Sequence, residues 1–230
     1  MSLFAIADLH LSLGTNKPMD VFGPHWANAN QKLEKNWRAK IAPEDTVVIA
    51  GDISWGMTPE EALPDLLFLD SLPGKKLLLK GNHDYWWSTR KKLETLFAQN
   101  NITSLDLLFN NAFAVGRLAV CGSRGWDIFG ESEQDLKLKN REELRLRESL
   151  RQAAALGGEP VAFLHYPPLS PVSPFCEFAD LLSEAGVRRC FYGHLHAGGQ
   201  SRAFLGSRKG TEYRLISADT INFDPVFIEE

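Results

Sequence analysis

The chain has 230 residues, of which 44% are hydrophobic and 23% are charged, and its formal net charge is −4. These values are typical of one globular domain, and they exclude a disordered, repetitive or collagen-like chain. The acidic net charge argues against general binding to nucleic acid or to anionic membranes. We therefore expect a single domain over residues 1–230.

The cellular compartment is indicated by what the sequence lacks. No apolar run reaches the roughly 18 residues needed to cross a bilayer, and residues 1–4 lack the basic stretch of a secretory signal. The three cysteines are odd in number and show no Cys-x-x-Cys spacing, so they predict neither a disulfide framework nor a thiolate zinc site. We expect a cytoplasmic protein that does not associate with membranes.

Short apolar runs rich in β-branched and aromatic residues predict buried strands. In chain order these strands cover residues 3–7, 46–50, 76–79, 112–115, 118–121, 161–164, 189–192 and 213–217. Amphipathic helices are predicted over 28–40, 58–69 and 88–98, the last with Ser88 as its N-cap. A heavily charged helix is predicted over 133–156, with a solvated outer face or, alternatively, a partner surface. The alternation of strands and helices predicts an α/β fold whose ligands gather at the strand ends.

Five of the six histidines follow directly after predicted strands, beside other polar side chains. The polar residues at these strand ends are Asp8, His10, Asp52, Asn82, His83, Asp84, His165, His194 and His196. Carboxylate, amide and imidazole groups suit Zn²⁺, Mn²⁺ or Fe. Any one of these residues alone has an ordinary explanation as a turn residue or helix cap. Five strand ends with compatible ligands together favour a metal site.

Local geometry should help these ligands to converge. Alternate residues of an extended segment point the same way, so Asp8 with His10, and His194 with His196, are each expected to reach one ion. Glycines at positions 51, 81 and 193 are expected to let the backbone turn sharply before the ligands.

The ordered blocks of these residues resemble the motif set of calcineurin-like metallophosphoesterases, in particular a small bacterial branch of predicted phosphohydrolases. The blocks are Asp8-x-His10, Gly51-Asp52, Gly81-Asn82-His83-Asp84, His165 and Gly193-His194-x-His196. The resemblance implies a four-layer α/β sandwich, in which two mixed β-sheets pack face to face with helices outside. It also implies a centre of two divalent metal ions, which are Mn, Fe or Zn.

The resemblance further implies a role for each matching residue. One metal would be held by Asp8, His10, His196 and a bridging Asp52, and the other by Asp52, Asn82, His165 and His194. His83 would be the general acid that protonates the leaving oxygen, with Asp84 orienting its imidazole; a purely structural histidine is the alternative.

Several side chains near these blocks are candidate substrate contacts. Trp55, Trp86 and Trp126 follow predicted strands and would form an aromatic wall, unless they only pack the loops together. Arg124 would bind a phosphate or carboxylate, with a surface or structural arginine as the alternative.

The residues and the resemblance together predict a binuclear metal-dependent phosphoesterase. It would hydrolyse a phosphomonoester or phosphodiester through a hydroxide activated by the two metals. Two divalent ions, Asp8, Asp52 and one hydroxide leave a charge of about +1, which would attract an anionic substrate to an acidic protein. The substrate would be a small phosphorylated compound, such as a nucleotide. The alternatives are a catalytically weak or inactive binding module with the same fold, and a dinuclear hydrolase of non-phosphate esters.

Overall fold

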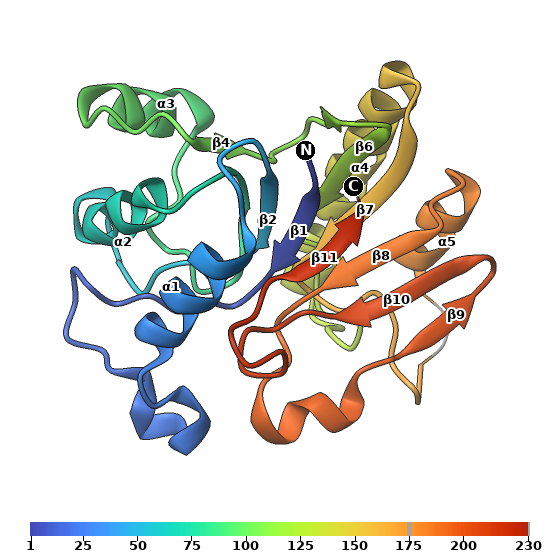
Figure 1. Ribbon diagram of the computed structural model, residues 1–230. Helices are drawn as coiled ribbons and strands as arrows, with labels where there is room; N and C mark the ends of the chain where they lie inside the picture. Colours follow the sequence, from blue (N-terminus) through green and yellow to red (C-terminus); the bar gives the residue numbers. More distant parts are fainter. Residues whose placement is uncertain (174–175, 230) are drawn as a thin grey trace.

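The computed structural model describes residues 1–173 and 176–229, apart from the side chain of residue 22. Its strands form two sheets (Figure 1). In spatial order the first sheet contains β11 (Val226–Glu229), β1 (Leu3–Ile6), β2 (Thr46–Ala50), β3 (Lys75–Leu79) and β4 (Leu105–Leu107). The second contains β5 (Phe113–Val115), β6 (Leu118–Ser123), β7 (Glu159–Leu164), β8 (Arg189–Tyr192), β10 (Thr211–Leu215) and β9 (Gly206–Arg208).

Both sheets are mixed. Strands β1 to β4 are parallel and β11 is antiparallel to β1. In the second sheet β6, β7, β8 and β10 are parallel, and the edge strands β5 and β9 are antiparallel to their neighbours. Parallel strands bring their carboxyl ends to one edge, so the loops that follow β1, β2, β3, β7 and β8 can meet there.

The helices form the two outer layers. The first sheet is covered by α1 (Ala29–Lys40), α2 (Pro59–Ser71) and α3 (Arg90–Gln99), and the second by α4 (Glu133–Leu156) and α5 (Glu177–Glu184) (Figure 1). Short 3₁₀ helices η1 (Met19–Phe22), η2 (Pro24–Trp26) and η3 (Ala197–Arg202) lie in the loops. No helix within residues 1–173 and 176–229 is long and apolar enough to cross a membrane.

Successive side chains of a strand point to opposite faces of the sheet, so each strand contributes to two hydrophobic clusters. Phe4 and Ile6 of β1 pack with Trp37 of α1 beneath the helices. Leu3 and Ala5 point the other way, into the cluster that joins the two sheets. The predicted four-layer sandwich is therefore confirmed.

The predicted elements need small corrections. Thr89, not Ser88, caps α3, because its hydroxyl accepts a hydrogen bond from the N–H of Lys92. The helix over 133–156 has the predicted bounds, but one face of it is buried on the second sheet and includes Glu142 and Leu146. Its solvated side carries Leu144, which is exposed.

Candidate metal centre

Four of the predicted ligands converge at the carboxyl ends of β1, β2 and β8. They are Asp8, His10, Asp52 and His196, and their ligand atoms all lie within 4.8 Å of one another. Nε2 of His196 is 3.2 Å from Nε2 of His10 and 3.5 Å from Oδ1 of Asp8. Four ligand atoms held about 2.1 Å from one tetrahedral ion would lie roughly 3.4 Å apart. This first ligand group therefore fits a divalent cation.

The sequence analysis predicted an extended backbone at these ligands, but the structure shows a different conformation. Asp8, His10 and Asp52 have φ values of +59°, +47° and +51°, in the left-handed region. Such a conformation costs about 1–3 kcal/mol per residue and persists where surrounding contacts enforce it. Here the N–H of Asp8 donates to the carbonyl of Gly51, and the N–H of His10 donates to that of Asp52. The two loops therefore hold each other in the conformation that makes their ligands converge.

The three glycines of the motifs serve two purposes. Gly51 has a φ of +92°, which favours glycine and agrees with the predicted turn. Gly81 and Gly193 do not have positive φ values; instead they allow close approach. A Cβ atom at Gly81 would overlap the carboxylate of Asp52, and one at Gly193 would overlap that of Asp8.

The remaining predicted ligands form a second ligand group beside the first. Oδ1 of Asn82 lies 2.7 Å from Nε2 of His165 and 2.8 Å from Nδ1 of His194. Oδ1 of Asp52 is 3.5 Å from Nε2 of His165, while its Oδ2 is 3.8 Å from Nε2 of His10. The two oxygens of one carboxylate thus face both groups. Burial raises the pKa of Asp52 to about 7, and a bound cation would favour its charged form.

The tautomer of His165 follows from its surroundings. Its Nδ1 lies 3.1 Å from the carbonyl oxygen of Ala50, which can only accept a hydrogen bond. The proton therefore resides on Nδ1, and Nε2 presents a lone pair to the second ligand group, as a metal requires.

A buried carboxylate that the sequence analysis missed, Asp219, orients a ligand of the first group. Its Oδ1 lies 3.1 Å from Nδ1 of His196, and its Oδ2 accepts hydrogen bonds from the N–H of Ala197 and the amide of Gln200. Nε2 of the half-exposed His25 is 3.9 Å from the same Oδ2. Asp219 thus directs Nε2 of His196 towards the ligand atoms.

Burial and charge set the protonation of these imidazoles differently. Burial lowers the pKa of both His10 and His194 to about 3, so both are neutral at pH 7. Burial acts in the same direction on His196, but hydrogen bonds with Asp219 and Asp8 outweigh it and raise the pKa of His196 to about 10. In the protein without metal, a proton on His196 supplies the positive charge that a cation would otherwise bring.

Comparison with known proteins agrees with this geometry. A family model described as calcineurin-like phosphoesterase matches residues 1–198, which include both ligand groups. The chain belongs to the calcineurin-like phosphoesterases. A comparison with curated proteins gives no match.

Two solved structures show how far the fold of this calcineurin-like phosphoesterase extends. Phosphopantetheinyl hydrolase from Mycobacterium tuberculosis is similar over 99% of this chain and 95% of its own, with a TM-score of 0.55 and 14% identity. The protein TT1561 of Thermus thermophilus is similar over 90% of this chain and 89% of its own, with a TM-score of 0.53 and 12% identity. At such identities the likeness concerns the fold alone.

The predicted general acid of this calcineurin-like phosphoesterase, His83, adjoins the first ligand group. Its ring centroid lies 5.7 Å from that of His10 and 4.7 Å from that of Trp55. Its backbone N–H donates to Oδ1 of Asp52 at 2.8 Å. Burial lowers the pKa of the imidazole, and its Nδ1 has no hydrogen-bond partner among the described residues. The side chain is therefore close to the centre and available for proton transfer.

Asp84 makes different contacts from those expected. Its carboxylate accepts hydrogen bonds from the N–H groups of Gly81, Asp52 and Ile53 and from the indole of Trp86. Within the described part of the chain it makes no hydrogen bond with the imidazole of His83. Asp84 joins the loops after β2 and β3, so it positions the ligand Asp52 instead of orienting the general acid.

The three tryptophans do not form one wall. Trp55 is half-buried and stacks on His10, with ring centroids 5.0 Å apart. Trp126 is also half-buried, and it packs against Tyr166 at 5.5 Å and donates to Asp135. Trp86 is only 1% exposed, so its expected contact with substrate is not supported. Of the three, only Trp55 contacts a predicted ligand or the general acid.

The expected substrate contact of Arg124 is also not supported. Its guanidinium lies 3.2 Å from Oε1 of Glu142 on α4, whose side chain is 1% exposed. The same oxygen accepts from Arg145 at 2.7 Å. The guanidinium of Arg124 also lies 4.5 Å from the ring centroid of Trp126. The structure favours the alternative of a structural arginine.

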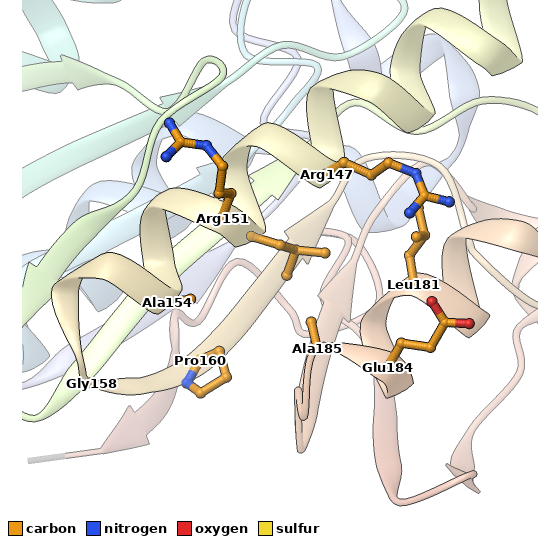
Figure 2. Close-up of a pocket in the computed structure, with 9 residues that line it drawn as sticks. Arg147, Arg151, Ala154, Gly158, Pro160, Leu181, Glu184 and Ala185 are labelled. Carbon is orange, nitrogen blue, oxygen red and sulfur yellow. The ribbon is translucent and has the colours of Figure 1, made fainter.

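Hollows adjoin both ligand groups. One of about 240 Å³ is lined by His10, Asp20 and Trp26, and another of about 350 Å³ is lined by His194 and Tyr166. A third hollow of about 440 Å³ lies between α4 and α5, with Arg147, Arg151 and Glu184 on its rim (Figure 2). This third hollow includes residues 158 and 160 at the amino end of β7, whereas His165 follows the carboxyl end. It is therefore separate from the candidate metal centre.

Proposed function

We propose that this calcineurin-like phosphoesterase is a binuclear metal-dependent enzyme that hydrolyses a phosphomonoester or phosphodiester. The observation that carries the proposal is the position of Asp52 between the two ligand groups. One of its oxygens faces His10 and the other faces His165, at 3.8 Å and 3.5 Å from the nearest imidazole nitrogens. A bridging carboxylate is what two adjacent ions require.

The donor sets fit two divalent ions. Asp8, His10 and His196 with one oxygen of Asp52 would hold the first. Asn82, His165 and His194 with the other oxygen would hold the second. When bound, the two ions would supply an acidified water and positive charge for the oxygens of the phosphate.

The protein itself would supply orientation and a proton. Asp219 and the carbonyl of Ala50 direct imidazole lone pairs into the centre, as described above. Protonated His83, which is not a member of either ligand group, would donate its proton to the departing alkoxide. Burial lowers the pKa of His83, whereas an anionic phosphate beside it would raise that pKa and favour the protonated imidazole that a general acid requires.

The charge of the ligands supports an anionic substrate. Asp8 and Asp52 are the only carboxylates in the two proposed sets, so two divalent ions would leave a surplus of about two positive charges before water or substrate binds. That surplus would attract a phosphate group to an otherwise acidic protein. We propose a small phosphorylated compound as substrate, with nucleotides among the compounds to test.

The decisive experiment combines metal analysis with two chromogenic substrates. The protein is loaded with Mn²⁺, Fe²⁺ or Zn²⁺, its metal content is measured, and p-nitrophenyl phosphate and bis(p-nitrophenyl) phosphate are assayed. We expect two metal ions per chain and turnover of at least one substrate, with Asp52→Asn deficient in both properties. Two bound ions without turnover of either substrate would contradict the enzyme and favour a binding module.

A further inference from the structure

The hollow beside His194 lies where the organic part of a phosphoester would extend from the second ligand group. Tyr166 and His194, which line it, are in ring contact at 4.3 Å. His194 is in turn 2.8 Å from Asn82. A phosphate at the proposed centre would therefore lie at the mouth of this hollow. The volume of about 350 Å³ is within the range of ligand-binding cavities, roughly 300–1,000 Å³.

The walls of this hollow are mixed in character. Ile128, Phe129, Leu169 and Leu195 provide apolar surface, and Phe129 is 52% exposed. Such a wall favours the carbon skeleton of a substrate over water. The hollow can therefore accept an apolar body.

The hollow contains one arginine. Arg202 lines the hollow and is exposed, and it makes no ion pair within residues 1–173 and 176–229. It ends η3, which begins immediately after His196 and is held by Asp219 through Ala197 and Gln200. The loop that places His196 in the first ligand group thus also positions the backbone of Arg202.

Tyr166 and Ser170 contribute hydroxyl groups to the hollow, and each hydroxyl can donate a hydrogen bond to an anion. The acidic group Asp127 already accepts a hydrogen bond from the N–H of Phe129. The hollow beside His10 also contains one aspartate, Asp20, but it has no Lys or Arg among its lining residues, whereas the hollow beside His194 has Arg202. An anionic group would therefore be accommodated on the His194 side.

We propose that this hollow binds the organic group of the phosphoester and that Arg202 selects organic groups that carry a second anion, either a carboxylate or another phosphate. This inference rests on the proposed phosphoesterase function. It narrows the substrate class to phosphoesters with at least two separate acidic groups.

The test compares two substrates that differ by one charge, phenyl phosphate and 4-carboxyphenyl phosphate. If only diesters are turned over, the p-nitrophenyl esters of the same two compounds replace them. We expect the specificity constant kcat/KM to be higher for the carboxylated member of the pair. In Arg202→Ala the ratio of the two constants should fall about three- to fivefold, the range of an exposed charge pair. Arg202→Lys should retain part of the preference, and Arg202→Glu should reverse it.

A matched control is provided by Arg188, which is also exposed but precedes β8, at the opposite end of the strand from His194. Arg188→Ala should leave the ratio unchanged. A ratio in the Arg202 variants equal to that of the wild type would overturn the inference, as would a preference for 4-(aminomethyl)phenyl phosphate governed by Asp127. Neither result would affect the proposed function. Failure of the metal-loaded protein to hydrolyse any member of the series would instead overturn the phosphoesterase function itself.

Discussion

Oδ1 of Asp219 lies 3.1 Å from Nδ1 of His196, so a buried carboxylate holds the imidazole from behind while Nε2 faces the first ligand group. Removing such a partner typically costs about 10- to 100-fold in metal affinity. Asp219→Ala should therefore weaken binding of the first metal by this factor, measured by titration with Mn²⁺. Asp224→Ala is the matched control, because Asp224 is a half-exposed partner of Lys40. Equal affinities of the two variants would show that Asp219 does not act through His196.

Asp52 and His10 should differ in how many metals their loss affects. Because the oxygens of Asp52 face both ligand groups, Asp52→Ala should reduce the bound metal from about two ions per chain to well below one. His10→Ala removes a ligand of the first group only and should leave the second ion in place. The metal content of each purified variant after dialysis gives the answer. Equal losses in the two variants would contradict the shared position of Asp52.

His83 should affect turnover and not metal content. Loss of a general acid typically lowers the rate about 10²- to 10⁴-fold. His83→Ala is expected to show such a decrease in kcat with unchanged metal stoichiometry. The decrease should be smaller for an aryl ester, whose leaving group needs little protonation, than for an alkyl ester. A uniform loss for both ester types would point to a structural role of His83.

Metal binding should release protons in a manner set by His196 and Asp52. The pKa of His196 is raised to about 10, so at pH 7–9 a metal must displace its proton, and affinity should rise about tenfold per pH unit. Below pH 7, Asp52 also becomes protonated because its pKa is raised to about 7, so the dependence should steepen. His10, with its pKa near 3, contributes nothing in this range.

Calorimetric titration with Mn²⁺ at pH 6, 7 and 8, in two buffers of different ionisation enthalpy, counts the released protons. Asp219→Asn should release fewer, because a neutral partner no longer raises the pKa of His196. An affinity independent of pH between 7 and 8 would contradict the assignment.

Arg124 should contribute to stability and not to substrate binding. Its partner Glu142 is buried and would keep only its other arginine contacts, so Arg124→Ala should lower the free energy of unfolding by about 2–3 kcal/mol. Arg151→Ala, which removes an exposed ion pair on the same helix, should lower the free energy of unfolding much less. Denaturant unfolding measures both. An increased KM in Arg124→Ala without loss of stability would restore Arg124 as a substrate contact.

Buried strands were the most predictable part of the fold. The strands at 46–50 and 189–192 have the predicted bounds, because continuous apolar runs ended by Gly leave little alternative. The strands β4, β9 and β11 escaped prediction because they are short and lie at sheet edges, where one side needs no apolar residues. Helix α5 was missed because it has eight residues and no side-chain cap, although Phe178, Leu181 and Leu182 share a buried face.

The candidate site was predictable in its residue types and not in its local geometry. The predicted ligands could be recognised because they follow parallel strands, whose carboxyl ends lie at one edge of the sheet. The left-handed conformations of Asp8 and His10 carry no local signal, since hydrogen bonds to the loop after β2 enforce them. Asp219 did carry a signal: it follows the predicted strand at 213–217, as the predicted ligands follow theirs. Asp84 was assigned to His83 because the two are neighbours in the sequence, whereas in the structure its carboxylate accepts hydrogen bonds from the N–H groups of Asp52 and Gly81.

Strand β11 pairs with β1, and the N–H of Ala218 donates to the carbonyl of Ala7, one residue before the ligand Asp8. The first ligands of the chain are thus supported by segments roughly 200 residues later in the sequence. During synthesis the loop after β1 would emerge early but lack these supports until β11 has also left the ribosome. The metal centre would consequently form only after β11 has been synthesised, and a nascent chain that ends before β11 would hold metal less firmly.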